Sequence, residues 1–111
     1  MSTRVVITGL GVVSPIGIGV PQFWKAALEG RSGISAIPSF DPFPLEGYRS
    51  RIAGRIVDFS PDQYLPAGQG DRVDRYAQFA LVAAKEALAD ADLKMERENP
   101  HRVGVIVGAG M

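Results

Sequence analysis

Apolar residues in this chain occur in two patterns, short uninterrupted runs and longer helical repeats. Residues 5–8 and 103–107 form two runs that are rich in β-branched side chains and carry no charge. A run that is apolar on both pleat faces is typical of a strand buried on both sides, as in the parallel sheet of an α/β protein. A buried helix segment is the alternative for the first run, but its β-branched content and the glycines and Ser14-Pro15 pair that follow disfavour it. We therefore predict two strands here.

Two further segments repeat apolar residues at helical spacing. The first runs from Gln22 to about Glu29, behind Pro21, which suits the first position of a helix, and before Gly30, which suits a left-handed cap. We expect its apolar face to pack on the sheet and its tryptophan to anchor the core; the face consists of Phe23, Trp24, Ala27 and Leu28. The second helix is predicted from Asp71, as N-cap, to about Ala91, with Asp74 in its first turn.

The middle of the chain is less regular. Residues 31–48 contain three prolines and scattered aromatic residues, which predicts a loop pinned to the surface by Phe40, Phe43 and Leu45. Residues 50–59 alternate weakly and predict a short edge strand, whose arginines protect an open edge. A small anion contact at these arginines is the alternative. The predicted order is βαβαβ, stopping within a larger fold.

Composition excludes several classes of function. The chain has 111 residues, which suits one small domain at most, and its 12 basic residues balance its 12 acidic ones. This balance indicates neither nucleic-acid nor membrane-surface binding. The absence of cysteine excludes disulfides, thiolate metal sites and a cysteine nucleophile within the sequence. We find no signal peptide or membrane-spanning run, and the cytoplasm is the expected location.

No motif supplies a complete active site. Gly9-x-Gly11-x-x-Ser14 approaches the dinucleotide-binding pattern, but serine stands in the third position and Pro15 follows where a phosphate-binding helix should turn. A nucleotide-binding module therefore stays a minor alternative. Ser14 lacks the context of a nucleophile elbow. His101 is the only histidine and lies in a polar loop, so we predict no metal site and no catalytic residue.

Five segments in order resemble the amino-terminal part of β-ketoacyl-acyl-carrier-protein synthases, both the elongating type II enzymes and the polyketide ketosynthases. The segments, which together cover essentially the whole chain, are residues 4–17, 23–34, 53–59, 72–78 and 103–110. The resemblance implies the beginning of the first half of a thiolase-like fold, with residues 1–111 as an incomplete domain.

The resemblance also implies a reaction. Family members transfer an acyl chain from carrier protein to a cysteine at a helix N-terminus, and a malonyl thioester then loses carbon dioxide and attacks the acyl-enzyme. The dipole of that helix lowers the thiol pKa, and backbone amides and two histidines assist. These catalytic side chains lie beyond residue 111 in family members, so we expect no condensing activity from this chain alone and no cofactor.

Two residues match peripheral positions of the family. Met111 matches a residue that lines and gates the acyl pocket, with a frayed end as the alternative. Arg72 matches a basic position that helps to dock the acidic acyl carrier protein, with an exposed helix-start arginine as the alternative. The resemblance further implies a homodimer or a ketosynthase heterodimer. A non-catalytic partner of the chain-length-factor type shares the same pattern and is the rival function.

Overall fold

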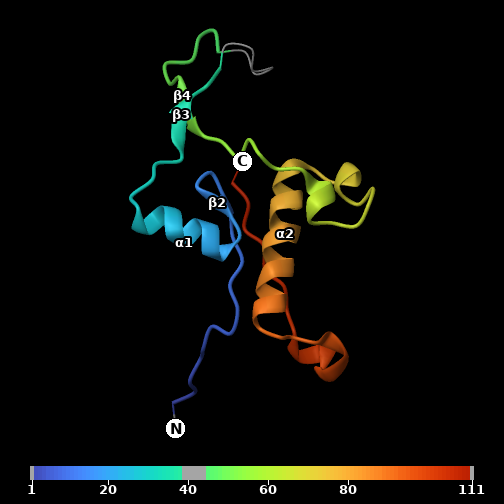
Figure 1. Cartoon of the computed structure of the whole chain (residues 1–111). Helices are drawn as coiled ribbons and strands as arrows, with labels where there is room; N and C mark the ends of the chain where they lie inside the picture. The colour runs from blue at the N-terminus through green and yellow to red at the C-terminus, as the bar shows by residue number, and fades with distance from the viewer. Residues whose placement is uncertain (1, 39–44, 111) are drawn as a thin grey trace.

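The computed structural model describes residues 2–38 and 45–110. Helices α1 (Val20–Leu28) and α2 (Arg75–Asp90) lie on either side of a small hairpin formed by β1 (Val13–Ser14) and β2 (Gly17–Ile18) (Figure 1). A second hairpin, β3 (Ile34–Ala36) and β4 (Ile52–Gly54), extends away from this centre and meets it only at its base, where a Cβ added to Gly54 would lie 3.4 Å from the Cγ of Pro15. Short 3-10 turns complete the described chain: η1 (Pro61–Gln63), η2 (Gly70–Arg72), η3 (Met95–Arg97) and η4 (Pro100–Arg102).

Both hairpins are antiparallel and short. Val13 pairs with Ile18 in the first, and Ile34 pairs with Gly54 in the second. Strand β4 confirms the strand predicted within residues 50–59. Its partner β3 lies in the segment predicted as a loop, because three residues there extend to meet β4. The pinning residues Phe40 and Phe43 lie outside the described residues.

The two runs predicted as buried strands are not paired as strands within the described residues, and this part of the prediction was wrong for the chain. They are highly exposed, with Val5 at 91% and Ile106 at 99% of their accessible surface. A doubly buried strand needs neighbours on both edges and layers on both faces, which this segment of sequence does not itself supply. The radius of gyration is 17.4 Å, against about 13 Å for a compact domain of this length.

Helix α1 begins two residues earlier than predicted, and Pro21 lies in its first turn. Gly30 follows with φ of +66°, which confirms the left-handed cap. The packing prediction for this helix was wrong, because Trp24 is 59% exposed whereas Ala26 is only 1% exposed. The helix approaches β2 at its first turn, where a Cβ added to Gly17 would lie 2.6 Å from the backbone nitrogen of Phe23, and the tryptophan faces outward.

Helix α2 has Asp74 as its N-cap residue, although the Asp74 side chain makes no capping hydrogen bond. The prediction of Asp71 as N-cap was wrong because the chain makes the separate turn η2 at residues 70–72 first. Beneath α2 lies a small core of Phe59, Leu65 and Val82. The ring of Phe59 stacks on Tyr64 at 5.6 Å between centroids and meets the edge of Phe79 at 4.9 Å.

The backbone of residues 9–12 lies directly on helix α2. A Cβ added to Gly11 would overlap the carbonyl oxygen of Ala83, and one added to Gly9 would overlap that of Ala87. Glycine is therefore required by the close approach of the two backbones. The alanines of α2 provide the matching flat surface.

Two carboxylates of α2 complete this contact. Glu86 accepts hydrogen bonds from the backbone N–H of Val12, at 3.0 Å, and of Val20, at 2.7 Å. One turn later, Asp90 accepts from the N–H of Leu10 at 3.0 Å. Val20 is the first residue of α1, so Glu86 also places negative charge at the positive end of that helix. Glu86 thus joins α2 to both ends of the β1–β2 hairpin.

The close approach predicts different outcomes for two Gly→Ala substitutions. In Gly11→Ala the new methyl group must displace the N-terminal segment from α2, and we expect a loss of about 2 kcal/mol of unfolding free energy. Gly104→Ala is the matched control, because a Cβ there meets nothing within 4 Å. Urea unfolding followed by circular dichroism measures both, and equal stabilities of the two variants would contradict the packing described here.

The hydrogen bonds of the carboxylates predict a second contrast. Glu86→Gln keeps the shape of the side chain, but its NH2 group faces a backbone N–H and can accept no hydrogen bond. We expect a loss of about 2 kcal/mol, since hydrogen bonds to charged groups are worth about 1.5–3 kcal/mol each. Asp90→Asn is the control, because only one of its oxygens is used and the amide oxygen can replace it. The same unfolding measurement tests both variants. If Glu86→Gln were as stable as the unchanged protein, the two hydrogen bonds that Glu86 accepts would not stabilise the fold.

Candidate functional site

Arg72, the residue expected to dock a carrier protein, lies in η2 immediately before α2. Its side chain is exposed, and it makes no hydrogen bond or ion pair with any residue that the structure describes. Asp71 beside it is also exposed. The structure therefore presents Arg72 as a surface cation that an external anion can reach.

The turn that carries Arg72 is held from two sides. Gly70 is buried against Pro61, and a Cβ at Gly70 would lie 2.5 Å from the Pro61 Cβ. On the other side, the Nε2 group of Gln78 donates to the carbonyl oxygens of Gly70, at 2.9 Å, and of Val73, at 3.2 Å. The backbone on both sides of Arg72 is thus fixed to neighbouring elements.

Arg75, one turn further on, has the same charge but a different environment. Its guanidinium donates to the carbonyl oxygen of Ile56 at 2.8 Å and lies 5.5 Å and 5.3 Å from the ring centroids of Phe59 and Phe79. A cation at this distance from aromatic rings is stabilised by their quadrupoles. Arg75 therefore joins α2 to the small core, and Arg72 is the more available of the two cations.

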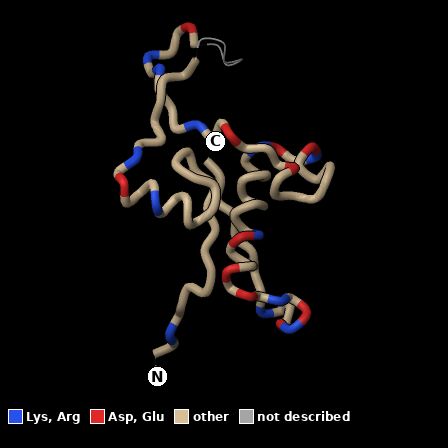
Figure 2. The backbone as a smooth tube through the Cα atoms, in the orientation of Figure 1, with Lys and Arg blue, Asp and Glu red and all other residues tan. Residues whose placement is uncertain are grey.

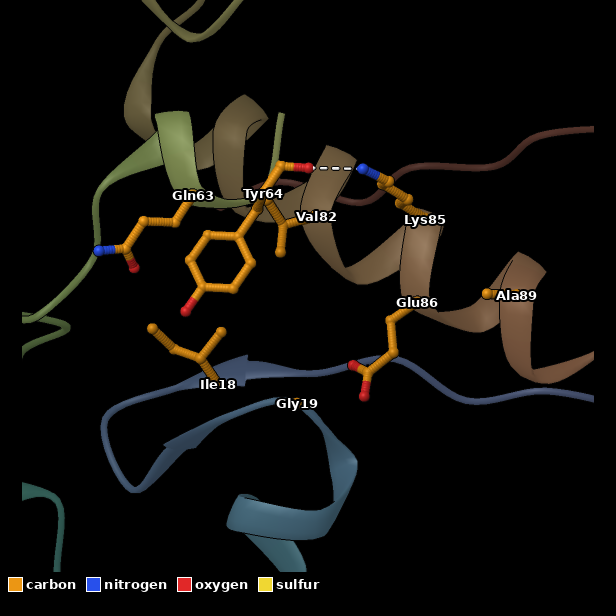
Figure 3. Close-up of a pocket in the computed structure, with 8 residues that line it drawn as sticks. All are labelled: Ile18, Gly19, Gln63, Tyr64, Val82, Lys85, Glu86 and Ala89. Carbon is orange, nitrogen blue, oxygen red and sulfur yellow. Dashed lines mark hydrogen bonds between the residues drawn. The ribbon is translucent and has the colours of Figure 1, made fainter. Parts of the chain in front are cut away.

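A pocket of about 370 Å³ opens between β2, η1 and α2 (Figure 3). Its wall contains one ammonium and one carboxylate among mostly apolar groups; the residues are Ile18, Gly19, Gln63, Tyr64, Val82, Lys85, Glu86 and Ala89. The ammonium of Lys85 donates to the carbonyl oxygen of Tyr64 at 2.7 Å. Both oxygens of Glu86 already accept backbone hydrogen bonds. Both charged groups of the pocket are therefore engaged in holding the backbone, and neither is free to serve as an acid or a base.

The glycine pattern at residues 9–11 has a structural explanation that disfavours nucleotide binding. A phosphate would need free backbone N–H groups at this turn. The N–H groups of Leu10 and Val12 instead donate to Asp90 and Glu86. A phosphate placed there would also meet the negative charge of both carboxylates.

The remaining predicted positions contribute no chemistry in the described structure. Met111, expected to line an acyl pocket, lies outside the described residues. His101 is exposed in η4, and its backbone N–H donates to Oδ1 of Asn99 at 3.0 Å. Within residues 2–38 and 45–110, no three side chains of metal-binding type gather at one place. No helix in the same ranges is long and apolar enough to cross a bilayer.

Sequence reasoning missed the residues that organise this region. Local pattern assigns no individual role to Glu86, Asp90 or Gln78. The available signal was the position of Glu86 within an alanine-rich part of α2, four residues before a second carboxylate. Residues four apart share one face of a helix, so this pair predicts a polar contact on the face that the alanines leave open to a close neighbour.

The sequence of this chain is similar to those of several ketoacyl synthases. A ketoacyl synthase β subunit of the tetracenomycin polyketide synthase from Streptomyces glaucescens is 44% identical over 96% of this chain. A 3-oxoacyl-[acyl-carrier-protein] synthase 2 from Vibrio harveyi is 40% identical over 97% of the chain. The chain spans about a quarter of the length of these relatives, at 25% of each.

A solved structure supports the same assignment at the level of the fold. The ishigamide ketosynthase/chain length factor matches 82% of this chain with a TM-score of 0.69 and 35% identity, and the match covers 22% of that protein's chain. This likeness confirms the predicted α/β, thiolase-like class, even though the expected parallel strands are unpaired here. The family model described as β-ketoacyl synthase, N-terminal domain, matches residues 2–111. The chain therefore belongs to the β-ketoacyl synthase family and lies within its N-terminal domain.

Proposed function

We propose that this chain is part of a 3-oxoacyl-[acyl-carrier-protein] synthase that extends acyl thioesters in fatty-acid or polyketide synthesis. The observation that carries the proposal is the family match across residues 2–111, together with relatives whose names include ketoacyl synthases of both kinds. The reaction is a decarboxylative Claisen condensation. Malonyl thioester loses carbon dioxide, its carbanion attacks the enzyme-bound acyl thioester, and the enzyme thiolate leaves as the 3-ketoacyl product forms.

Within this function, residues 1–111 serve as framework. The sequence contains no cysteine, so it offers no thiol on which an acyl-enzyme could form. We place the nucleophile and its two assisting histidines outside this sequence, as the family pattern implies. The carboxylates of α2 then act by holding the first segment of the fold and take no part in the chemistry.

The partners of the proposed enzyme are an acyl carrier protein and a second synthase chain, either identical or of the ketosynthase heterodimer type. Arg72 is the proposed contact for the acidic carrier protein, supported by its exposure and its lack of an ion pair among the described residues. Met111 is the proposed acyl-pocket residue on family pattern alone. We further propose a cytoplasmic location.

A non-catalytic subunit of the chain-length-factor type is the second candidate. One relative is named as a ketoacyl synthase β subunit, and the solved structure has a chain length factor in its title. The residue at the nucleophile position of the full-length protein separates the two candidates: cysteine supports the synthase, and any residue without a nucleophilic side chain supports the partner subunit.

The absence of a thiol predicts that the purified 111-residue chain forms no 3-ketoacyl product. Incubation with acyl- and malonyl-carrier protein, followed by mass spectrometry of the carrier-bound thioesters, measures this directly. An active type II synthase under the same conditions is the positive control. Accumulation of 3-ketoacyl-carrier protein above the enzyme-free background would overturn the framework role.

The exposure of Arg72 predicts that charge reversal weakens carrier-protein binding. In Arg72→Glu an attractive contact becomes repulsive, and we expect the dissociation constant to rise by about fivefold to tenfold at low salt, with a smaller effect at high salt. Arg97→Glu in η3 makes the same charge change on another exposed turn and is the control. Titration calorimetry measures both. Equal weakening by the two variants would show that net charge, and not Arg72, governs the encounter.

A further inference from the structure

Gln78 connects helix α2 to the turn that precedes it. Its side chain is partly buried, lies on the first turn of α2 and reaches back over η2. One amide nitrogen makes both hydrogen bonds, 2.9 Å to Gly70 and 3.2 Å to Val73. An amide NH2 group has two hydrogens, so this geometry uses its full donor capacity.

The two carbonyl groups that Gln78 holds lie on either side of Asp71 and Arg72. Gly70 is at the same time fixed against Pro61, where no Cβ would fit. The backbone that carries Arg72 therefore has little freedom to move, although the Arg72 side chain itself is exposed. A binding group on a fixed backbone loses less conformational entropy when its partner arrives.

We propose that Gln78 is a positioning residue that pre-organises Arg72 for an acidic protein partner. The inference rests on the proposed docking role of Arg72 and adds the group that makes it effective. Gln78 acts through the backbone carbonyls of Gly70 and Val73 and does not touch the partner. Its contribution is therefore expressed only when Arg72 is present.

Coupling between the two residues separates this role from general support of the helix. Gln78→Met has a similar length but no donors, and it should weaken binding of an acidic acyl carrier protein by about threefold to tenfold. Arg72→Ala should weaken it by at least as much. In a double-mutant cycle, adding Gln78→Met to Arg72→Ala should change the affinity by less than about 1.5-fold, because the residue being positioned is already gone.

The experiment uses the full-length synthase subunit that contains residues 1–111, and measures by titration calorimetry the dissociation constants of this protein and its variants for holo acyl carrier protein. Gln63→Met, the same chemical change in the neighbouring turn η1, is the matched control and should leave the affinity unchanged. Amide hydrogen exchange at Val73, whose N–H donates to Gly70, reports whether the turn loosens in Gln78→Met. If Gln78→Met loses helix content, Gly70→Ala displaces the same turn from its other side and replaces it in the cycle.

The possible results test the positioning role of Gln78 separately from the docking role of Arg72. Coupled losses, with faster exchange at Val73, support the positioning role. Additive losses, or no loss in Gln78→Met while Arg72→Ala weakens binding, overturn the positioning role and leave the docking function in place. No loss in Arg72→Ala itself refutes docking through this arginine, and the positioning role falls with it.

Discussion

The arrangement of this chain depends on one close contact, the backbone of residues 9–12 lying directly on helix α2. Side chains normally separate a helix from its neighbour, and here glycine removes them on one side while alanine reduces them on the other. Such proximity brings backbone N–H groups against the helix, where the N–H of Val12 is partly shielded from water and gains from an acceptor. Glu86 and Asp90 supply those acceptors, and Glu86 carries the connection on to the start of α1.

This contact also decides what the surrounding groups can do. The glycines that could suggest a phosphate-binding turn are needed for packing, and the N–H groups that a phosphate would use are bound to carboxylates. The carboxylates in turn are occupied by the backbone. The region is consequently a framework, consistent with a synthase whose reacting groups lie elsewhere. Residues 5–24, which include this contact, carry no charged side chain, and Figure 2 shows the tube rising from the N-terminus without blue or red beyond Arg4.

The two arginines near the start of α2 show how environment assigns different roles to one residue type. Arg75 is held by Ile56 and two aromatic rings, so its charge stabilises the small core. Arg72 stands on a fixed turn with its guanidinium exposed, which suits recognition of an acidic surface. The difference arises from Gln78 and Pro61, which fix the turn without engaging the side chain that it carries.

The sequence by itself determined the family, both helices, the left-handed cap at Gly30 and the edge strand within residues 50–59, because these depend on local spacing and on motifs several residues long. Only the tertiary structure decided that Trp24 faces outward, that Asp74 and not Asp71 occupies the N-cap position of α2, and that Glu86 and Asp90 hold backbone far away in the sequence. It also left residues 5–8 and 103–107 unpaired. The physical reason is that burial, strand pairing and hydrogen bonds to remote N–H groups depend on neighbours far away in the sequence, which local pattern does not specify.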